Sequence, residues 1–250
     1  QAHLVDPPNQ ARAFMPFSNG LDSAAIAHEL QAKNSSLELV LVNVRAKDNP
    51  TRWENLGRSN GRPFKTLQVT AVSPDPHHAE PSFRARPFLF DLLAGYGAAT
   101  AQPAYVVIPE NGQGSLGGSL VPLGAEAPHR SCHPGFTARL SKVVEQMTGQ
   151  VVRYEHPALF RTKGQVLKAL FERQKSQERD WLAHRSCSYD ARHSSHGGKV
   201  MHCGTCGNCL LRRVSLLWAG IEDSTGYRAD DLRGQSLHEA YIGGLPRGIK

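Results

Sequence analysis

The chain has 250 residues, of which 40% are hydrophobic and 20% are charged, so it can bury a full core and should be globular. Its formal charge of +7 suits anionic ligands such as nucleotides or RNA, but the 29 basic residues are spread along the chain rather than clustered. No apolar run approaches the roughly 18 residues of a membrane span, and no signal-peptide pattern opens the sequence. We therefore expect a soluble, cytoplasmic protein without a membrane partner.

Strand-like and helix-like segments alternate along most of the chain. The run over 37–44 is nearly continuous aliphatic, which is typical of a parallel strand covered on both faces. Ile26 and Leu30, one helical turn apart among small alanines, predict a helix that packs closely on a sheet. Together the pattern predicts an α/β fold with a parallel sheet. In chain order, strands are expected over 13–17, 37–44, 66–72, 104–108 and 151–154, and helices over 22–32, 83–99, 136–147 and 162–173.

The turn over 18–23 separates the first predicted strand from the first helix. In such a junction the backbone N–H groups point at one spot beside the positive end of the helix dipole, where a phosphate is stable. Ser18 and Ser23 add hydroxyl donors, Gly20 lets a phosphate approach the backbone, and Asp22 can cap the helix or help to hold Mg²⁺. The alternative is an ordinary strand–turn–helix junction. Neither G-x-x-x-x-G-K-[ST] nor G-x-G-x-x-G is present, so neither a Walker-type nor a dinucleotide site is indicated.

A second candidate ligand segment follows the strand predicted over 104–108. The segment 109–118 is rich in glycine and carries Glu110 and Asn111. Long loops at the carboxyl ends of parallel strands are where α/β proteins place their sites. We expect a ligand loop here, with a flexible surface connection as the alternative.

Four of the five cysteines form a C-x15-C-x2-C-x2-C array near the C-terminus. Two-residue spacings place consecutive sulfurs on one tetrahedral ion, so the array predicts a structural zinc site. A redox pair, an iron–sulfur cluster and an inert buried set are the alternatives, and His193, His196 or His202 could replace one cysteine. The expected ligands are Cys187, Cys203, Cys206 and Cys209.

The fifth cysteine, Cys132, is expected to be a free thiol outside the array. Its sequence neighbours His129, Arg130 and His133 are basic, so we expect them to lower its pKa if the thiol is exposed.

Taken together, these motifs resemble those of one family. The turn over 18–23 resembles the S-G-G-x-D-S loop (PP-loop) of the ATP pyrophosphatases, with Asn19 in place of a glycine. The segment 203–212 is similar to the C-G-x-C-x-x-C-x-x-R ending of the 7-cyano-7-deazaguanine synthases (QueC). Between these ends, 84–90 resembles that family's P-G-R-N segment, with Arg86 at the arginine, and 155–159 with Lys163 resembles its T-P-L segment followed by lysine.

The resemblance implies a PP-loop ATP pyrophosphatase fold, Rossmann-like, and an ATP-dependent C–N ligase. Such proteins activate the carboxylate of 7-carboxy-7-deazaguanine as an acyl-adenylate, let ammonia form the amide and dehydrate the amide with a second ATP. It implies ATP with Mg²⁺ on 18–23 and a structural zinc ion. Catalytic roles fall to Asp22, Lys163 and Arg86, and substrate binding to Arg86, Glu110 and Asn111.

The departures from the family pattern keep further functions open. They are Asn19 in the nucleotide loop, the long segment between Cys187 and Cys203, and the residues at 110–112. QueC-like proteins of antiphage operons would attach a deazapurine to a protein amine, and a homodimer or an operon-encoded protein is then a possible partner. A tRNA-modifying PP-loop enzyme and a catalytically inactive zinc-bearing interaction module are also compatible with these motifs.

The same reasoning predicts how the chain is divided. We expect a flexible arm over 1–12, a PP-loop domain over 13–180 and a small helical zinc-binding region over 181–250 that packs on it.

Overall fold

The computed structural model describes residues 12–18, 20–46, 58–59, 62–63, 65–71, 85–117, 131–173, 182, 184–187 and 201–233. Five strands form one sheet in the order β5-β2-β1-β6-β7, and every neighbouring pair is parallel. The α/β prediction is therefore confirmed. The strands of this sheet are β1 (Arg12–Pro16), β2 (Glu38–Ala46), β5 (Lys65–Ala71), β6 (Ala104–Val107) and β7 (Tyr154–Glu155), and β3 (Arg58–Ser59) and β4 (Arg62–Pro63) form a separate antiparallel pair.

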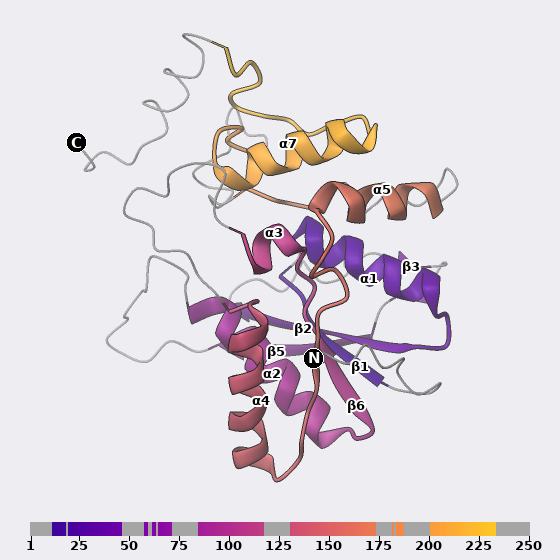
Figure 1. Cartoon of the computed structure of the whole chain (residues 1–250), viewed down its shortest axis with the longest axis vertical. Coiled ribbons are helices and arrows are strands. Elements are labelled where there is room, and N and C mark those ends of the chain that lie inside the picture. Colours follow the sequence, from indigo (N-terminus) through magenta and orange to yellow (C-terminus); the bar gives the residue numbers. More distant parts are fainter. Residues whose placement is uncertain are drawn as a thin grey trace, which may run out of the picture.

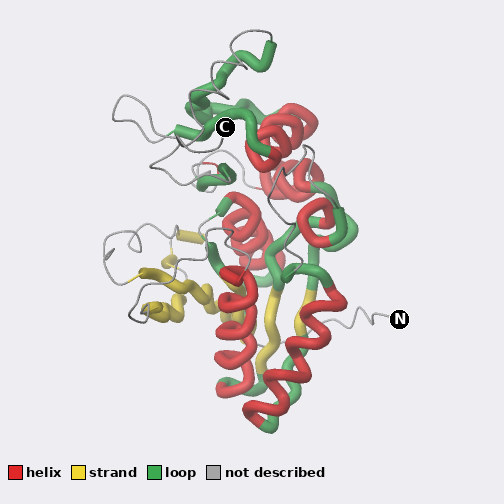
Figure 2. Tube along the Cα trace, turned by 90° about the vertical axis from the view of Figure 1, so that its left-hand side faces the viewer, coloured by secondary structure: helices red, strands yellow, loops and turns green. Residues whose placement is uncertain are grey.

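Helices cover both faces of the sheet (Figure 1). Helices α1, α5 and α7 lie on one side, where α5 packs against both α1 and α7, and helices α2 and α4 pack together on the other. Figure 2 shows the described loops of the C-terminal region at the same end of the molecule as α7. The helices are α1 (Leu21–Lys33), α2 (Ala85–Thr100), α3 (Gly112–Ser115), α4 (Pro134–Thr148), α5 (Lys163–Arg173) and α7 (Gly207–Ala219).

The alternation of side chains along the strands builds two cores. In β1, Met15 points into the core shared with α1, α5 and α7, whereas Phe14 points into the core shared with α2 and α4. Leu41 and Val42 of β2 divide in the same way. Each such side chain contributes about 1.5–3 kcal/mol when it is fully buried. A strand that is apolar at successive positions is therefore stabilised from both faces.

Two predicted segments differ from the structure. The last strand lies at Tyr154–Glu155 rather than over 151–154, because Val151 is exposed and β6 pairs with Tyr154 and Glu155. The Gly-rich segment is not only a loop. It contains the short helix α3, which Asn111 caps by accepting the N–H groups of Gln113 and Gly114.

None of the helices in the described part of the chain is both long and apolar enough to cross a membrane.

A buried ion pair fixes the segment before α5 against α1. Glu29 is 3% exposed, and Arg161 Nη1 lies 2.8 Å from both of its carboxylate oxygens. Lys33 lies 2.6 Å from the same carboxylate. Burial alone would raise the pKa of Glu29, but hydrogen bonds from Lys33 and Arg161 hold it below its ordinary value. The Arg161 carbonyl also accepts the N–H of Gly112, so this pair ties α1 to two loops.

Replacing Arg161 by Met should lower the free energy of unfolding by about 1.5–3 kcal/mol, because Glu29 then loses a charge-assisted partner while it stays buried. The matched control is Lys33→Met, which removes an exposed cation and should cost no more than about 1 kcal/mol. Urea unfolding of the three proteins measures both effects. Equal losses in the two variants would contradict the assignment.

Candidate functional site

Three loops meet at the carboxyl edge of the sheet, where the strand order reverses between β1 and β6. The first joins β1 to α1, the second follows β6 and leads into α3, and the third joins β7 to α5. Such a reversal opens a crevice in α/β folds, and ligands bind there. The two segments that the sequence nominated as ligand loops, 18–23 and 109–118, are therefore neighbours.

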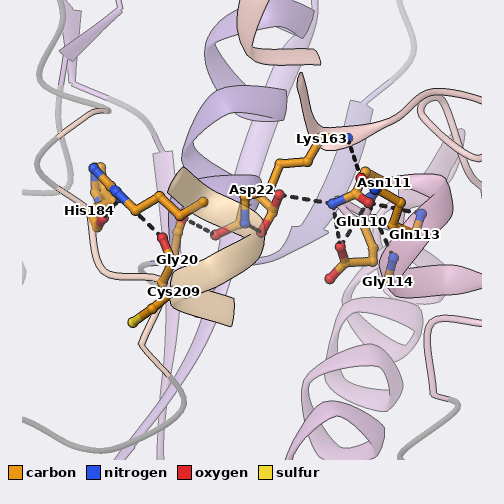
Figure 3. Close-up of polar contacts among 12 residues, drawn as sticks. Gly20, Asp22, Glu110, Asn111, Gln113, Gly114, Lys163, His184 and Cys209 are labelled. Atoms are coloured by element: carbon orange, nitrogen blue, oxygen red, sulfur yellow. Dashed lines mark hydrogen bonds and ion pairs between the residues drawn. The ribbon is translucent and has the colours of Figure 1, made fainter. Parts of the chain in front are cut away.

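A polar network connects these three loops (Figure 3). Lys163 Nζ lies 2.8 Å from Asp22 Oδ2, and Asn111 Nδ2 donates to Asp22 Oδ1 at 3.0 Å. Asn111 Nδ2 also lies 2.9 Å from Glu110 Oε1. The structure thus brings together four residues that sequence reasoning assigned to catalysis or substrate binding. Their roles remain predictions, but their proximity is a structural fact.

The backbone holds this network in place at several points. Asn111 is 2% exposed, and its amide oxygen caps α3 while its amide nitrogen contacts both carboxylates. The Gln113 side chain accepts the backbone N–H of Lys163 at 2.9 Å. Gly112 admits no side chain, since a Cβ there would lie 2.3 Å from the Leu159 carbonyl oxygen. In this structure Asn111 orients Asp22 and Glu110, and direct contact with a substrate stays a prediction.

Glu110 has an unusual protonation equilibrium. Removal of its carboxyl group from water raises its pKa to about 8, and the neighbouring Asp22 carboxylate adds to the rise, while Lys163 opposes it. A carboxyl group with a pKa near neutral pH can exchange a proton with a bound molecule. Glu110 is therefore a candidate acid–base group.

The segment 18–23 leads from β1 into the first turn of α1, and Gly20 rather than Asp22 caps the helix. Gly20 is the N-cap of α1 in an extended conformation, and Asp22 lies in the first helical turn. Of the two roles that the sequence left open for Asp22, the helix cap is therefore wrong, and the role at Mg²⁺ stays a prediction. Ser23 Oγ donates to the Gly20 carbonyl at 2.9 Å, and Ser18 is exposed. Asn19 lies outside the described residues.

One of the N–H groups expected to face a phosphate has a protein partner instead. The N–H of Leu21 donates to the Arg185 carbonyl at 3.0 Å. Within the described part of the chain, the N–H groups of Asp22 and Ser23 have no acceptor. Both donors lie at the positive end of α1, where an anion is stabilised, and neither has a partner among the described residues.

Arg86 lies in the first turn of α2, and its side chain is outside what the structure describes.

The free thiol of Cys132 has the opposite electrostatics from those expected. The side chain is half-buried, and burial raises its pKa, with the carboxyl groups of Glu110, Asp91 and Asp22 adding to the rise. The expected lowering required an exposed thiol; this one is half-buried, and acidic residues lie close to it in space. His129 and Arg130 lie outside the described residues.

Asp91 is the acidic residue that sequence reasoning missed. It is 2% exposed on α2, its Oδ2 atom has no hydrogen-bond partner among the described residues, and burial raises its pKa well above the ordinary range. A lone carboxylate inside the apolar run 88–93 was the available signal.

The cysteine array forms a compact cluster. The four Sγ atoms all lie within 4.8 Å of one another, and the described residues contain no other group of this kind. Backbone N–H groups point at the sulfurs: Cys206 N lies 3.3 Å from Cys203 Sγ, and Cys209 N lies 3.4 Å from Cys206 Sγ. Four thiols at this separation fit a tetrahedral zinc ion. The cluster consists of Cys187, Cys203, Cys206 and Cys209.

His202 lies beside the cluster without joining it. Its ring packs against Tyr227 with the ring centroids 5.8 Å apart, and burial lowers its pKa to about 4, with the Arg212 and Arg185 charges acting in the same direction. His193 and His196 lie outside the described residues.

The first test concerns the metal. We expect about one zinc ion per chain as purified, and we expect Cys206→Ser to lose it and to unfold at a markedly lower temperature, because metal binding energy is folding energy in thiolate clusters. Cys132→Ser, outside the cluster, is the control and should keep its metal. Native mass spectrometry and thermal unfolding decide. A Cys206→Ser protein with normal metal content and stability would rule the site out.

The second test concerns Glu110. Its pKa of about 8 in the folded protein exceeds the ordinary 4.5, so between these values the folded chain holds a proton that the unfolded chain has released. Stability contributed by this group is complete below the lower pKa and is lost as the pH rises toward the higher one.

Glu110→Gln cannot ionise, so its stability should fall less than that of the wild type as the pH rises from about 5 to about 8. Urea unfolding at a series of pH values gives the dependence of the unfolding free energy on pH for both proteins. Glu145→Gln, which changes an exposed residue, is the control. The prediction fails if Glu110→Gln and the wild type have the same slope.

Comparison with known proteins adds homology to this geometry. No protein-family model matches the chain. A 7-cyano-7-deazaguanine synthase of Rhizobium rhizogenes is 24% identical over 236 residues, which cover 86% of this chain and 91% of the relative. One of Brucella canis is equally similar over 86% of this chain and 92% of its own length. One of Methanocaldococcus jannaschii is 34% identical over 92 residues, which cover 37% of this chain and 38% of the relative. The chain thus has homologues named 7-cyano-7-deazaguanine synthase along most of its length.

Proposed function

We propose that this protein is an ATP-dependent ligase that activates the carboxylate of 7-carboxy-7-deazaguanine and converts it through the amide to the nitrile, 7-cyano-7-deazaguanine. The observation that carries this proposal is the Asp22–Lys163 ion pair, with Asn111 and Glu110 beside it, at the point where the nucleotide loop meets the segment after β6. The name and coverage of the homologues support the substrate.

The first turn of α1 is the proposed phosphate site. Two unpaired N–H groups, those of Asp22 and Ser23, lie at the helix N-terminus within the described residues. The helix dipole favours an anion there by about 0.3–1 kcal/mol when the site is exposed, so further charge must come from elsewhere. The carboxylate oxygens of Asp22 are the donor type that Mg²⁺ prefers, and they would help to hold the ion that accompanies ATP.

Lys163 supplies the cation that the reaction requires. A substrate carboxylate that approaches the α-phosphate of ATP is repelled by like charge, and Lys163 is a 2% exposed ammonium group at this edge. In the first step a carboxylate oxygen bonds to the α-phosphorus, and the bond to pyrophosphate breaks. Lys163, with Arg86 as a second cation, stabilises the charge on the transferring phosphoryl group.

In the second step, in which ammonia reacts with the acyl-adenylate, a base must accept a proton from the attacking nitrogen. Ammonia attacks the acyl carbon, the bond to AMP breaks, and the nitrogen loses a proton as the amide forms. Glu110 in its ionised form can take up that proton, because its pKa of about 8 lies close to neutral pH. The amide oxygen then bonds to the α-phosphorus of a second ATP, and the bond to pyrophosphate breaks. Loss of AMP and a proton gives the nitrile.

The cysteine cluster would hold a zinc ion with a structural role, since four thiolates leave no coordination position open. We assign residues 13–180 to the nucleotide and substrate site, and residues 181–250 to the supporting metal-binding region.

The experiment is a single-turnover assay with ATP, Mg²⁺ and 7-carboxy-7-deazaguanine, followed by quantification of AMP and pyrophosphate. Wild-type protein should release both. Lys163→Met should slow release by about 10²–10³-fold, because a preorganised charge acts mainly on the transition state. The matched control is Lys168→Met on the same helix, whose half-exposed side chain faces Trp218, and it should leave the rate unchanged.

Guanine, which lacks the carboxylate, should give no AMP. Release of AMP and pyrophosphate that is independent of the carboxylate substrate would contradict the proposal, and so would wild-type rates in Lys163→Met. If adenylate forms but the amide does not, adding a protein substrate in place of ammonia tests a protein amine as acceptor, and adding tRNA tests an RNA acceptor.

A further inference from the structure

We propose that Arg212 is a positioning residue that links the cysteine cluster to the nucleotide loop, so that metal loading and ATP binding stabilise each other. This inference rests on the proposed function for its nucleotide. The connection itself consists of described contacts that run from the cluster through Leu182 and residues 184–187 to the first turn of α1.

The segment 184–187 lies directly against the nucleotide loop. Arg185 pairs with Gly20 in a parallel bridge, and its carbonyl accepts the N–H of Leu21 at 3.0 Å. The edge of the His184 ring faces Phe17 with the centroids 6.1 Å apart. Figure 3 shows Gly20 and His184 on the opposite side of Asp22 from Glu110. The position of Leu21, and with it the first turn of α1, therefore depends on this segment.

Arg212 of α7 holds the segment by its backbone. The residue is 2% exposed, and its guanidinium group donates to the carbonyl oxygens of His184 at 2.9 Å and Leu182 at 2.7 Å and to Ser186 Oγ at 3.0 Å. A planar group with five donors is suited to several acceptors at fixed angles. The N–H groups of Arg212 thus fix residues on both sides of Arg185.

The cysteine cluster contributes residues at both ends of this connection. Cys187 follows Arg185 by two residues, and its sulfur accepts the N–H of Cys203 at 3.5 Å. On the other side, Cys206 caps α7, and Cys209 lies three residues before Arg212, on the same helical face. A metal ion bound by these cysteines would fix Cys187 relative to the base of α7. The Arg185 carbonyl would then have one position against Leu21.

Two consequences follow from this arrangement. Loss of the metal should release the segment and weaken ATP binding, and bound ATP should by the same coupling free energy slow the loss of metal. Couplings between sites in proteins commonly lie on the order of 5- to 150-fold in affinity, and we expect an effect in this range.

Arg213 provides a matched control, because it lies next to Arg212 on α7 and points elsewhere. Its guanidinium group donates to the carbonyl oxygens of Ala229 and Asp230. The same group stacks on Tyr227, with Cζ 3.7 Å from the ring centroid. Arg213→Met removes the same charge from the same helix, and the side-chain contacts of Arg213 among the described residues are with Tyr227, Ala229 and Asp230.

The experiment compares metal-loaded wild type, Arg212→Met, Arg212→Lys and Arg213→Met. Metal content, hydrogen exchange of the Leu21 amide and the Kd of Mg-ATP are measured for each. Arg212→Met should keep its metal, expose the Leu21 amide to exchange and bind Mg-ATP at least about 5-fold more weakly. Arg212→Lys should restore part of the affinity, and Arg213→Met should match the wild type.

The outcomes separate the two proposals. If wild type does not bind Mg-ATP, the proposed function fails, and the Leu21 amide still reports on the connection. If wild type binds and Arg212→Met has unchanged exchange and affinity, or if Arg213→Met is equally impaired, the inference is overturned.

Chelation of wild type is a second measurement in case Arg212→Met does not fold. Metal removal should expose the Leu21 amide to hydrogen exchange before the Met15 amide in β1. Bound Mg-ATP should slow the loss of metal. Simultaneous loss of protection at both amides, or a rate of metal loss that does not depend on Mg-ATP, would overturn the inference.

Discussion

The ion pair between Asp22 and Lys163 joins residues that are 141 positions apart, and the arrangement of the site depends on it. Lys163 begins α5, and Asp22 lies in the first turn of α1, so the pair fixes two helices at the edge of the sheet where β1 and β6 end. Asn111 donates to the same carboxylate and adds the segment after β6. A buried ammonium group without this partner would be costly, and the pair therefore holds the three loops in one position.

Acidic groups gather around the Asp22–Lys163 ion pair. The Cys132 thiol lies near three carboxyl groups, those of Glu110, Asp91 and Asp22. Burial raises the pKa of both Glu110 and Asp91, which favours the protonated form of each group and so reduces the repulsion between adjacent carboxyl groups. A site of this kind accepts an anionic substrate more easily than the count of acidic residues suggests, because neutral carboxyl groups can also donate hydrogen bonds.

Elements with a complete local signal were predictable from the sequence. The buried strands β1 and β2 are apolar at successive positions, and the cysteine spacing alone identifies the cluster. Features that depend on contacts between residues far apart in the sequence could not be predicted. Helix α3 has four residues and depends on the Asn111 cap and on space beside Leu159. The contact of Leu21 with Arg185 and the acidic surroundings of Cys132 arise only when the chain folds.

The raised pKa of Cys132 determines which cysteines of this protein can react. A thiol attacks oxidants and alkylating agents as the thiolate, and Cys132 provides little of it at neutral pH despite its place beside the site. In the cluster, by contrast, hydrogen bonding with the Cys187 thiol lowers the pKa of Cys203 to about 6, while hydrogen bonds within the cluster raise the pKa of Cys187 and of Cys209. Oxidative damage should therefore begin at the cluster, where sulfurs only 3.8 Å apart can pair as a disulfide once no metal protects them. Sensitivity to peroxide in this protein would report the state of its metal centre rather than chemistry at the substrate.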